Sequence, residues 1–299
     1  MSKTVLVELS DALADAAERA GKATVLVNAR RRMPASGIAY AADLILTADH
    51  VIEREEDITV TLAEGTQVPA KVVGRDPDSD LALLKLERAD AQVAEVTKSP
   101  ARLGQIALVL GRPSTNGIEA SLGTVSAIGG PVRTARGGML EKYIRTDGIS
   151  YPGFSGGPLV AADGTVLGLN TSGIANGAAL TIPADIAWRT AETLAKHGRV
   201  KHGYLGIRSQ AVEIPGLTQK ALKREQASGL VILSVEKDSP ASKGGLMVGD
   251  ILVSVAGVPV FHHDDLFARL SGDVVGKSEP IEILRGGQPQ TLNVLIGER

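Results

Sequence analysis

The chain of 299 residues contains no cysteine, which excludes disulfide bridges and thiolate metal sites. Aromatic residues make up only 3% of it, so Val, Leu, Ile and Ala must fill most of the core. The net charge is −2, and the one dense basic run, Arg30–Arg32, is interpreted as a solvated loop. Nucleic-acid binding would need a broader basic face, so no nucleic-acid partner is expected. No apolar run reaches the roughly 18 residues that cross a membrane, so no membrane span is expected.

The first 20 residues lack the basic start and apolar stretch of a signal peptide. The expected location is therefore cytoplasmic, or periplasmic or otherwise extracytoplasmic if a leader was removed. The segment "LSDALADAAERAG" instead predicts a short amphipathic helix, with Ser10 as its N-cap and Gly21 just past its end.

The length predicts about two domains at roughly 150 residues each. With 34 glycines and many short β-rich runs between residues 24 and 182, the first part is typical of a barrel or sandwich. A helical period follows over residues 184–196. The polar stretch "HGRVKHG" at 197–203 is predicted to be a linker. It separates a first domain, 1–196, from a second β-rich domain, 204–299.

The stretch "YPGFSGGPLV" at Tyr151–Val160 places Ser155 among glycines just before an apolar run. A nucleophilic serine needs a base, an acid that orients the base, and N–H donors for the developing oxyanion. In a tight turn the N–H groups of Gly153 and Ser155 can point at one spot. A plain glycine-rich turn that contains a serine explains the same pattern, so both interpretations stay open at this point.

The base and the acid are sought among residues that flank buried strands. His50 ends the apolar run "DLILTADHVI", and Asp80 opens the apolar run of "DPDSDLALLKL". The histidine pKa of about 6.5 suits a general base. His197 and His202 lie in the predicted linker. The pair at residues 262–263 is expected to be an exposed turn before a helix, and no metal site or cofactor is expected.

The strings "LTADHVI", "SDLALLKL" and "PGFSGGPLV", in the order His–Asp–Ser, resemble the chymotrypsin class of proteases. More specifically, "TDGISYPGFSGGPLV", "VLGLN" and "TIPADI" resemble the HtrA (Deg) family of serine proteases. The resemblance implies a mainly β fold, a chymotrypsin-like double β-barrel protease domain followed by one PDZ domain.

The resemblance also assigns roles to the residues of the expected active site. It makes His50 the general base, Asp80 its orienting acid and Ser155 the nucleophile, and it forms the oxyanion hole from the N–H groups of Gly153 and Ser155. Phe154 departs from the small polar residue that usually precedes the serine. In trypsin-like enzymes a carboxylate six residues before the serine selects Lys or Arg, and here that position is Ile149.

An apolar, shallow specificity pocket is therefore expected, with cleavage after Val, Leu, Ala or similar residues. The pocket would include Ile149 and the cleft residues Asn170, Thr171 and Ser172.

In the second domain, "YLGI" and "DSPASKGGLMVGDILVSVAGVPV" resemble the family's PDZ domains. Leu205, Gly206 and Ile207 would offer backbone N–H groups to the C-terminal carboxylate of a peptide, which adds as a strand at a sheet edge. The resemblance implies an endopeptidase that cleaves unfolded or exposed polypeptides, with regulation by peptide binding. The alternative is a largely latent peptide-binding chaperone or stress sensor.

Two further expectations concern regulation and assembly. The glycine-rich, basic segment Gly129–Arg145 is predicted to include a sensor loop that responds to peptide binding, or to be a plain surface loop. The family usually forms trimers through aromatic residues near the N-terminus. Because no Phe, Tyr or Trp precedes Tyr40, a homo-oligomer is expected but a trimer contact of that kind is in doubt.

Overall fold

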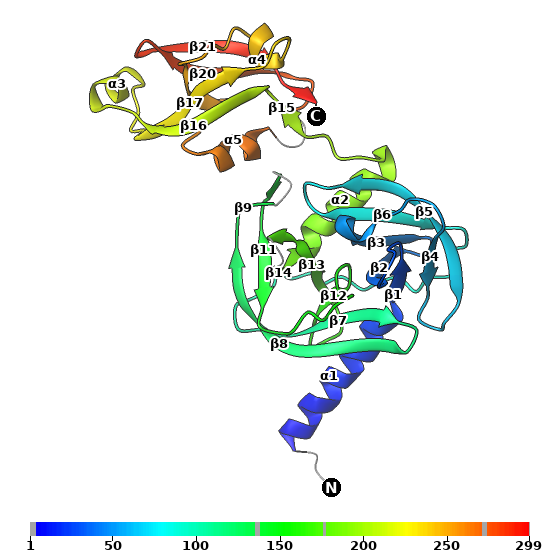
Figure 1. The fold of residues 1–299 in the computed structure, drawn as a ribbon. Coiled ribbons are helices and arrows are strands. Elements are labelled where there is room, and N and C mark those ends of the chain that lie inside the picture. Colours follow the sequence, from blue (N-terminus) through cyan, green and yellow to red (C-terminus); the bar gives the residue numbers. More distant parts are fainter. Residues whose placement is uncertain (1–3, 135–137, 176–177, 271–273, 299) are drawn as a thin grey trace. The chain divides into compact units, whose positions relative to one another are not determined.

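The computed structural model describes residues 4–134, 138–175, 178–270 and 274–298 (Figure 1). The chain divides into two compact units, Met1–Val200 and Lys201–Arg299. The division falls within the predicted linker at 197–203, of which His197 ends a helix and Gly203 begins a strand.

The first unit contains two closed β-barrels, each formed by antiparallel strands (Figure 1). The first barrel has the strand order β1-β2-β3-β6-β5-β4. Its strands are β1 (Thr24–Asn28), β2 (Ala35–Ala41), β3 (Leu44–Ala48), β4 (Ile58–Thr61), β5 (Gln67–Asp76) and β6 (Leu81–Leu86). The second barrel has the order β11-β14-β13-β12-β7-β8. Its strands are β7 (Ile106–Ser114), β8 (Gly117–Gly129), β11 (Tyr143–Thr146), β12 (Pro158–Ala161), β13 (Val166–Ala175) and β14 (Ala178–Pro183). The predicted double-barrel fold is confirmed.

The patterning of the strands explains which surfaces they bury. From Gln67 to Lys71, β5 alternates exposed and buried side chains, as expected for a strand with one face on a core. In β6, every residue but Lys85 is buried, because helix α2 (Ala184–His197) packs over β5 and β6. Aliphatic and alanine side chains fill the core of the first barrel, as the shortage of aromatic residues requires.

Of the two helices in this unit, α2 agrees with the predicted bounds and the N-terminal helix does not. Helix α2 occupies the predicted segment and ends at Gly198, whose φ of +72° supplies the left-handed cap that glycine favours. Helix α1 runs over Val5–Lys22, so the predicted start at Ser10 and end before Gly21 were wrong. Residues 5–9 contain no helix breaker, so the helix extends through them. Gly21 lies inside the helix, where Ile118 approaches so closely that a Cβ would be 2.8 Å from the Ile118 Cδ1.

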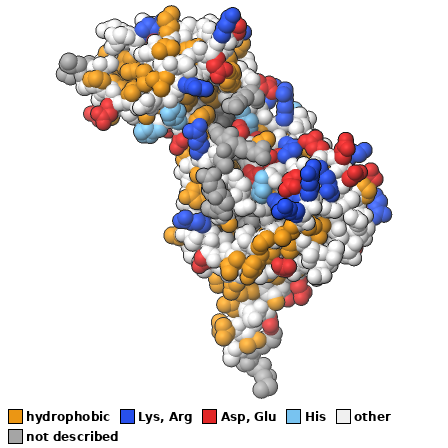
Figure 2. Space-filling model, in the orientation of Figure 1, with side chains coloured by type: hydrophobic (Ala, Val, Ile, Leu, Met, Phe, Trp, Pro, Cys, Tyr) orange, Lys and Arg blue, Asp and Glu red, His pale blue; other side chains and the backbone are white. Residues whose placement is uncertain are grey.

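The N-terminal part of α1 exposes apolar side chains, at Val5, Leu6, Val7 and Leu9, which Figure 2 shows as apolar surface along this helix. Among the helices in the described ranges, none combines the length and apolar character needed to cross a bilayer.

The second unit is a sheet of order β16-β17-β18-β20-β21 with three short helices. Its strands are β16 (Ile207–Glu213), β17 (Ser228–Val235), β18 (Ile251–Val255), β20 (Ser278–Arg285) and β21 (Gln288–Leu295), with the short β19 (Val258–Pro259) beside β18. A small pair joins β15 (Gly203–Tyr204) to β22 (Gly297–Glu298). The helices are α3 (Gly216–Ala221), α4 (Pro240–Lys243) and α5 (His263–Arg269).

The expected exposed turn at residues 262–263 was wrong for His263. This residue begins α5, and its partly buried ring lies 2.9 Å, through Nε2, from the carbonyl oxygen of Ser209. Asp265 accepts the backbone N–H groups of Phe261 and His262, which starts the helix at this point.

Candidate active site

The first barrel brings His50 and Asp80 together. His50 lies on the single 3₁₀ turn η1 (Asp49–Val51) that follows β3, and Asp80 lies directly before β6. The His50 Nδ1 is 2.8 Å from the Asp80 Oδ2, and the His50 backbone N–H donates to the Asp80 Oδ1 over 2.8 Å. Because β3 pairs with β6, these two strand ends lie side by side. The carboxylate therefore holds both the ring and the backbone of the histidine.

The backbone of Asp80 supports this geometry. Its φ of +57° is in the left-handed region, which Asp and Asn adopt more readily than most residues. Its carbonyl oxygen accepts the N–H of Asp49 over 3.0 Å. Asp80 is therefore tied to η1 through backbone and side chain together, and its side chain is only 6% exposed.

Asp80 also has a partner from the second barrel. The Thr171 hydroxyl, on β13, donates to the Asp80 Oδ2, and the same hydroxyl accepts the Gly173 N–H over 2.9 Å. Gly173 lies against the His50–Asp80 pair, because a Cβ there would be 2.5 Å from the Asp80 Oδ2 and 2.6 Å from the His50 Nδ1. The sequence analysis did not single out Gly173, and no local sequence signal points to its role.

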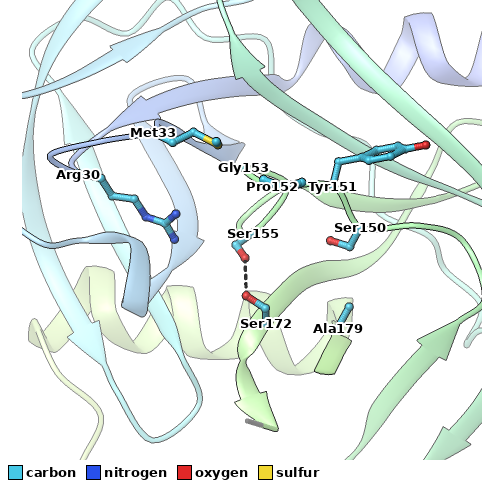
Figure 3. A pocket seen from close by; sticks show the side chains of 9 residues that line it. All are labelled: Arg30, Met33, Ser150, Tyr151, Pro152, Gly153, Ser155, Ser172 and Ala179. Atoms are coloured by element: carbon cyan, nitrogen blue, oxygen red, sulfur yellow. Dashed lines mark hydrogen bonds between the residues drawn. The ribbon is translucent and has the colours of Figure 1, made fainter. Parts of the chain in front are cut away.

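Ser155 lies in a tight turn between β11 and β12 of the second barrel (Figure 3). The Phe154 N–H donates to the Tyr151 carbonyl over 3.0 Å, with Gly153 at φ +89° inside this turn. Pro152 followed by a glycine of positive φ is the pattern of a type II turn. Within the described part of the chain, the N–H groups of Gly153 and Ser155 form no hydrogen bond. Both donors are thus open to an oxygen atom.

The side chain of Phe154 anchors the turn in the core of the second barrel. Its ring is fully buried with the apolar side chains of the second barrel and meets the Tyr151 ring edge to face at 5.4 Å. Gly111 faces this ring, since a Cβ there would be 2.4 Å from the Phe154 Cδ1. Phe154, where a small polar residue is usual, therefore anchors the turn in the apolar core of the second barrel.

A buried serine from the first barrel supports the same turn. Ser36, on β2, donates its hydroxyl to the Gly153 carbonyl over 2.7 Å, and its backbone N–H donates to the Ser155 carbonyl over 3.1 Å. Gly156 lies against Ser36, because a Cβ at Gly156 would be 2.1 Å from the Ser36 carbonyl oxygen. Ser36 was not among the predicted site residues, because its long separation from Ser155 in the sequence leaves no local signal.

The nucleophilic oxygen has a partner other than the histidine in this structure. The Ser155 Oγ is 3.2 Å from the Ser172 Oγ. A dashed line marks this contact in Figure 3. Within the described ranges, no hydrogen bond joins Ser155 to His50. Active-site hydrogen bonds of this kind often form only once substrate is bound.

A cavity of about 370 Å³ opens beside Ser155. Its described lining residues are Arg30, Met33, Ser150, Tyr151, Pro152, Gly153, Ser155, Ser172 and Ala179 (Figure 3). Of the four residues predicted to form the specificity pocket, Ser172 lines this cavity. Ile149 is 56% exposed, whereas Asn170 and Thr171 are buried. Asn170 accepts the Thr181 hydroxyl, so its side-chain oxygen is used within the barrel.

The segment that leads to the serine turn is fixed by a carboxylate. Asp147 accepts the backbone N–H and the hydroxyl of Thr124, on β8. The backbone N–H of Thr124, more than the hydroxyl, holds the pKa of Asp147 below its usual value. The Ile149 N–H donates to the Ser121 hydroxyl, which adds a second attachment to β8.

Comparisons with known proteins agree with this architecture. Residues 35–169 match the family model of a trypsin-like peptidase domain, and residues 203–296 match that of a PDZ domain. A putative serine protease HhoB of Synechocystis is 32% identical, over 90% of this chain and 67% of the relative. The chain belongs to the HtrA family of serine proteases. The expected resemblance, with one PDZ domain after the protease domain, is confirmed.

Solved structures support the same assignment. The HtrA-type protease AlgW with a decapeptide superposes with a TM-score of 0.81 at 28% identity, over 96% of this chain and 98% of that one. The serine endoprotease from Yersinia pestis gives a TM-score of 0.80 at 29% identity, with coverage of 96% and 98%.

The curated relatives include longer proteins. A probable periplasmic serine endoprotease described as DegP-like, from Pseudomonas fluorescens, is 34% identical over 269 residues, 88% of this chain. These residues cover 56% of that relative, so the chain spans little more than half the length of the DegP-like proteins it matches.

In the PDZ domain, the predicted carboxylate-binding residues lie where β15 leads into β16. The Leu205 carbonyl accepts the Ala241 N–H and the Gly206 carbonyl accepts the Glu236 N–H, each over 2.8 Å. Ile207 begins β16, which stands at one end of the sheet order. The arrangement leaves β16 as a sheet edge beside the "YLGI" turn.

The predicted sensor segment Gly129–Arg145 is described in part. Strands β9 (Val132–Arg133) and β10 (Met139–Leu140) form a small hairpin within it. Residues 135–137 of the segment lie outside the described residues. Among the residues that the structure describes, no group of three or more potential metal ligands comes together.

Proposed function

We propose that the protein is a serine endopeptidase that cleaves unfolded or exposed polypeptides through an acyl-enzyme. The observation that supports this most is the hydrogen-bonded His50–Asp80 pair in the same unit as a serine turn whose N–H groups at Gly153 and Ser155 are open. A base held by a carboxylate and two free N–H donors beside a serine are the elements that acyl transfer needs.

Each residue has a defined part in this reaction. Ser155 attacks the scissile carbonyl, and the His50 Nε2 takes its proton and later gives it to the leaving amine. Asp80 keeps the Nδ1 protonated and stabilises the positive ring. The N–H groups of Gly153 and Ser155 bind the oxyanion, and one such donor contributes about 3–4 kcal/mol to transition-state stabilisation. No cofactor takes part in these steps.

Specificity is proposed to favour aliphatic residues before the scissile bond. Ile149 stands where trypsin-like enzymes place a carboxylate, and Ser172 and Ala179 line the cavity next to Ser155. Asn170 and Thr171 are buried, and we propose that they support the specificity pocket without touching the substrate. Cleavage of a peptide library after Val, Leu or Ala would support this proposal, and dominant cleavage after Lys or Arg would contradict it.

The PDZ domain is proposed to bind peptide C-termini at Leu205, Gly206 and Ile207, with the peptide added as a strand along β16. Peptide binding would then shift the protease toward its active state through the segment Gly129–Arg145. We place the domains at 1–196 and 204–299, with 197–203 as the linker. Activity unchanged by C-terminal peptides and by removal of residues 203–299 would contradict this regulation.

A largely latent chaperone or sensor is the alternative, which the similarity to serine endoproteases does not favour. In this structure the Ser155 hydroxyl contacts Ser172 and not His50. A protease in which this arrangement persists would bind polypeptides without cleaving them.

A fluorophosphonate probe, which labels only an activated serine, separates the two candidates. The purified protein is treated with the probe with and without casein, and Ser155→Ala serves as the control. Labelling of the wild type without casein supports a constitutive protease, and labelling only with casein supports a substrate-gated one. Absence of labelling in both conditions would overturn the protease proposal in favour of the chaperone or sensor.

The proposal extends to location and assembly. Because the DegP-like relative is described as periplasmic, we favour an extracytoplasmic location over the cytoplasmic one. Cell fractionation of the producing organism tests this. We propose a homo-oligomer, and analytical ultracentrifugation that finds only monomer would contradict it.

A further inference from the structure

Arg30 is the one cation that lines the cavity beside Ser155 among the described lining residues. It lies between β1 and β2, in the loop that the sequence analysis interpreted as solvated. Figure 3 shows its guanidinium directed toward Ser155, with Ser150 and Tyr151 on the opposite side of the serine. Arg30 and the residues of the serine turn therefore face the same cavity from two sides.

Among the described residues, the Arg30 guanidinium has no hydrogen-bond or ion-pair partner. Its Nε is buried without a hydrogen-bond partner, and no ion pair of its side chain occurs within the described residues. Burial lowers the pKa of Arg30, while the charges of Glu53 and Asp80 act in the opposite direction. A half-buried cation that has lost part of its hydration and gained no partner is stabilised when a carboxylate approaches it.

The loop that presents Arg30 is held in place. The Ala29 carbonyl accepts the N–H of Glu53 over 3.0 Å, and the Arg30 carbonyl accepts the Arg54 guanidinium over 3.1 Å. Glu53 is occupied by the Arg31 N–H at 3.3 Å. The Glu53 carboxylate therefore supports the loop backbone, and the side chain of Arg30 stays available to the cavity.

The position of Arg30 in the cavity indicates which side of the scissile bond it serves. Figure 3 shows Arg30 on one side of Ser155 and Ser150, Tyr151 and Ala179 on the other. The wall made by Ser150, Tyr151 and Ala179 lies across Ser155 and suits the residue before the bond. Arg30 thus stands on the leaving-group side.

We propose that Arg30 is a specificity-determining residue that binds an Asp or Glu side chain in the first two positions after the scissile bond. The inference rests on the proposed endopeptidase function and names its substrate class: polypeptides with an aliphatic residue before the cleaved bond and an acidic residue after it. A planar guanidinium can bind such a carboxylate through two parallel hydrogen bonds.

The test uses quenched-fluorescent peptides with both ends blocked. They carry Val before the scissile bond and Glu, Gln or Lys at each of the two following positions. The expected kcat/KM is about 10-fold higher for Glu than for Gln, and lower still for Lys, with a preference that weakens as salt rises. In Arg30→Gln the Glu-to-Gln ratio falls to about 1, and in Arg30→Lys part of the preference remains.

Arg31→Gln is the matched control, because Arg31 is exposed and its contact to Glu53 is made by its backbone. This variant retains the Glu preference. Equal denaturant midpoints for wild type and Arg30→Gln show that the substitution leaves the fold intact. A Glu-to-Gln ratio that is unchanged in Arg30→Gln, or a ratio of about 1 in the wild type, overturns the proposal.

Two further measurements test whether Arg30 binds a side-chain or a terminal carboxylate, and whether it binds peptides that are not cleaved. A preference that appears only when the C-terminus is left unblocked would assign the cation to a terminal carboxylate and overturn the side-chain proposal. Binding of the same peptides to Ser155→Ala, followed by fluorescence anisotropy, needs no cleavage. A tighter Kd for Glu than for Gln that is lost in Arg30→Gln/Ser155→Ala supports the role of Arg30, even if the wild type cleaves nothing and the protease proposal fails.

Discussion

The Ser36 hydroxyl donates a hydrogen bond of 2.7 Å to the Gly153 carbonyl, across the boundary between the two barrels. The same hydroxyl accepts the Arg112 N–H over 2.8 Å, and the residue is fully buried. One side chain of the first barrel therefore fixes the peptide unit that follows Gly153, and with it the direction in which the neighbouring N–H groups point. The geometry proposed for the oxyanion hole depends on how the two barrels meet.

Ser36→Ala tests this relationship. The substitution leaves the Gly153 carbonyl and the Arg112 N–H without a side-chain partner in a buried place, which costs about 1–3 kcal/mol of unfolding free energy. We expect fluorophosphonate labelling of Ser155 to slow at least 10-fold, beyond what the fraction of folded protein explains. Ser126→Ala, which removes a hydroxyl bonded to the Arg145 carbonyl on the exposed side of the barrel, should change neither quantity much. Normal labelling in Ser36→Ala would contradict the positioning role.

Thr171→Val tests the support of Asp80. The change keeps the shape of the side chain but removes the hydroxyl that donates to the Asp80 Oδ2 and accepts the Gly173 N–H. Hydrogen-bond partners that orient the ligands of catalytic metals contribute about 10- to 100-fold to activity, and we expect a comparable effect for the partner of Asp80. We expect kcat to fall about 10-fold with little change in KM, and Thr171→Ser to restore most of it. Loss confined to KM would instead place Thr171 at the substrate.

Gly173→Ala tests the closeness of β13 to the catalytic pair. The new Cβ would stand 2.5 Å from the Asp80 Oδ2, so His50 or Asp80 must shift. A displacement of about 1 Å costs roughly 100-fold in rate, and we expect this loss in kcat/KM. Gly216→Ala is the control, because a Cβ at Gly216 meets nothing within 4 Å. Full activity of Gly173→Ala would show that this contact does not constrain the pair.

Asp147→Asn tests the pH dependence that the Thr124 hydrogen bond creates. The folded protein holds the pKa of Asp147 below the unfolded value of about 3.9, chiefly through the Thr124 backbone N–H. Its contribution to stability is therefore present above pH 3.9 and is lost as the pH falls through the folded pKa. Urea unfolding at low salt should show the variant less stable than the wild type at pH 7, with the difference shrinking below pH 4. A difference that is constant from pH 7 to pH 3 would contradict this.

Much of the fold was predictable because its signals are local. Short apolar runs such as "LALLKL" between turn residues predicted strands, and Ala184–His197 combined a helical period with a glycine cap. The start of α1 was predicted wrongly, because Ser10 is a good N-cap by residue type and yet lies inside a helix that begins at Val5. A capping residue marks a helix start only where the preceding residues disfavour helix.

The site was predictable to the extent that its residues carry their own local patterns. Ser155 stands in a glycine-rich turn, while His50 and Asp80 flank buried strands, and the sequence order of the three strings led to the family. Ser36 and Gly173 have no such pattern, and the basic run that contains Arg30 was interpreted as a solvated loop. Each of the three lies near residues of the site that are distant in the sequence and come close only once the barrels have closed.

The sequence by itself determined the class of protein. It shows two domains, strands rich in Val, Leu and Ile, and the histidine, aspartate and serine motifs in the order typical of the family. Only the tertiary structure decided which groups surround the reacting atoms. It joined the Thr171 hydroxyl to Asp80, the Ser36 hydroxyl to Gly153 and the Ser155 hydroxyl to Ser172, and it left the guanidinium of Arg30 at the cavity. The physical reason is that strand patterns and turns follow from neighbours in the chain. Hydrogen bonds between two barrels depend instead on the register and closure of both, which no short stretch of sequence encodes.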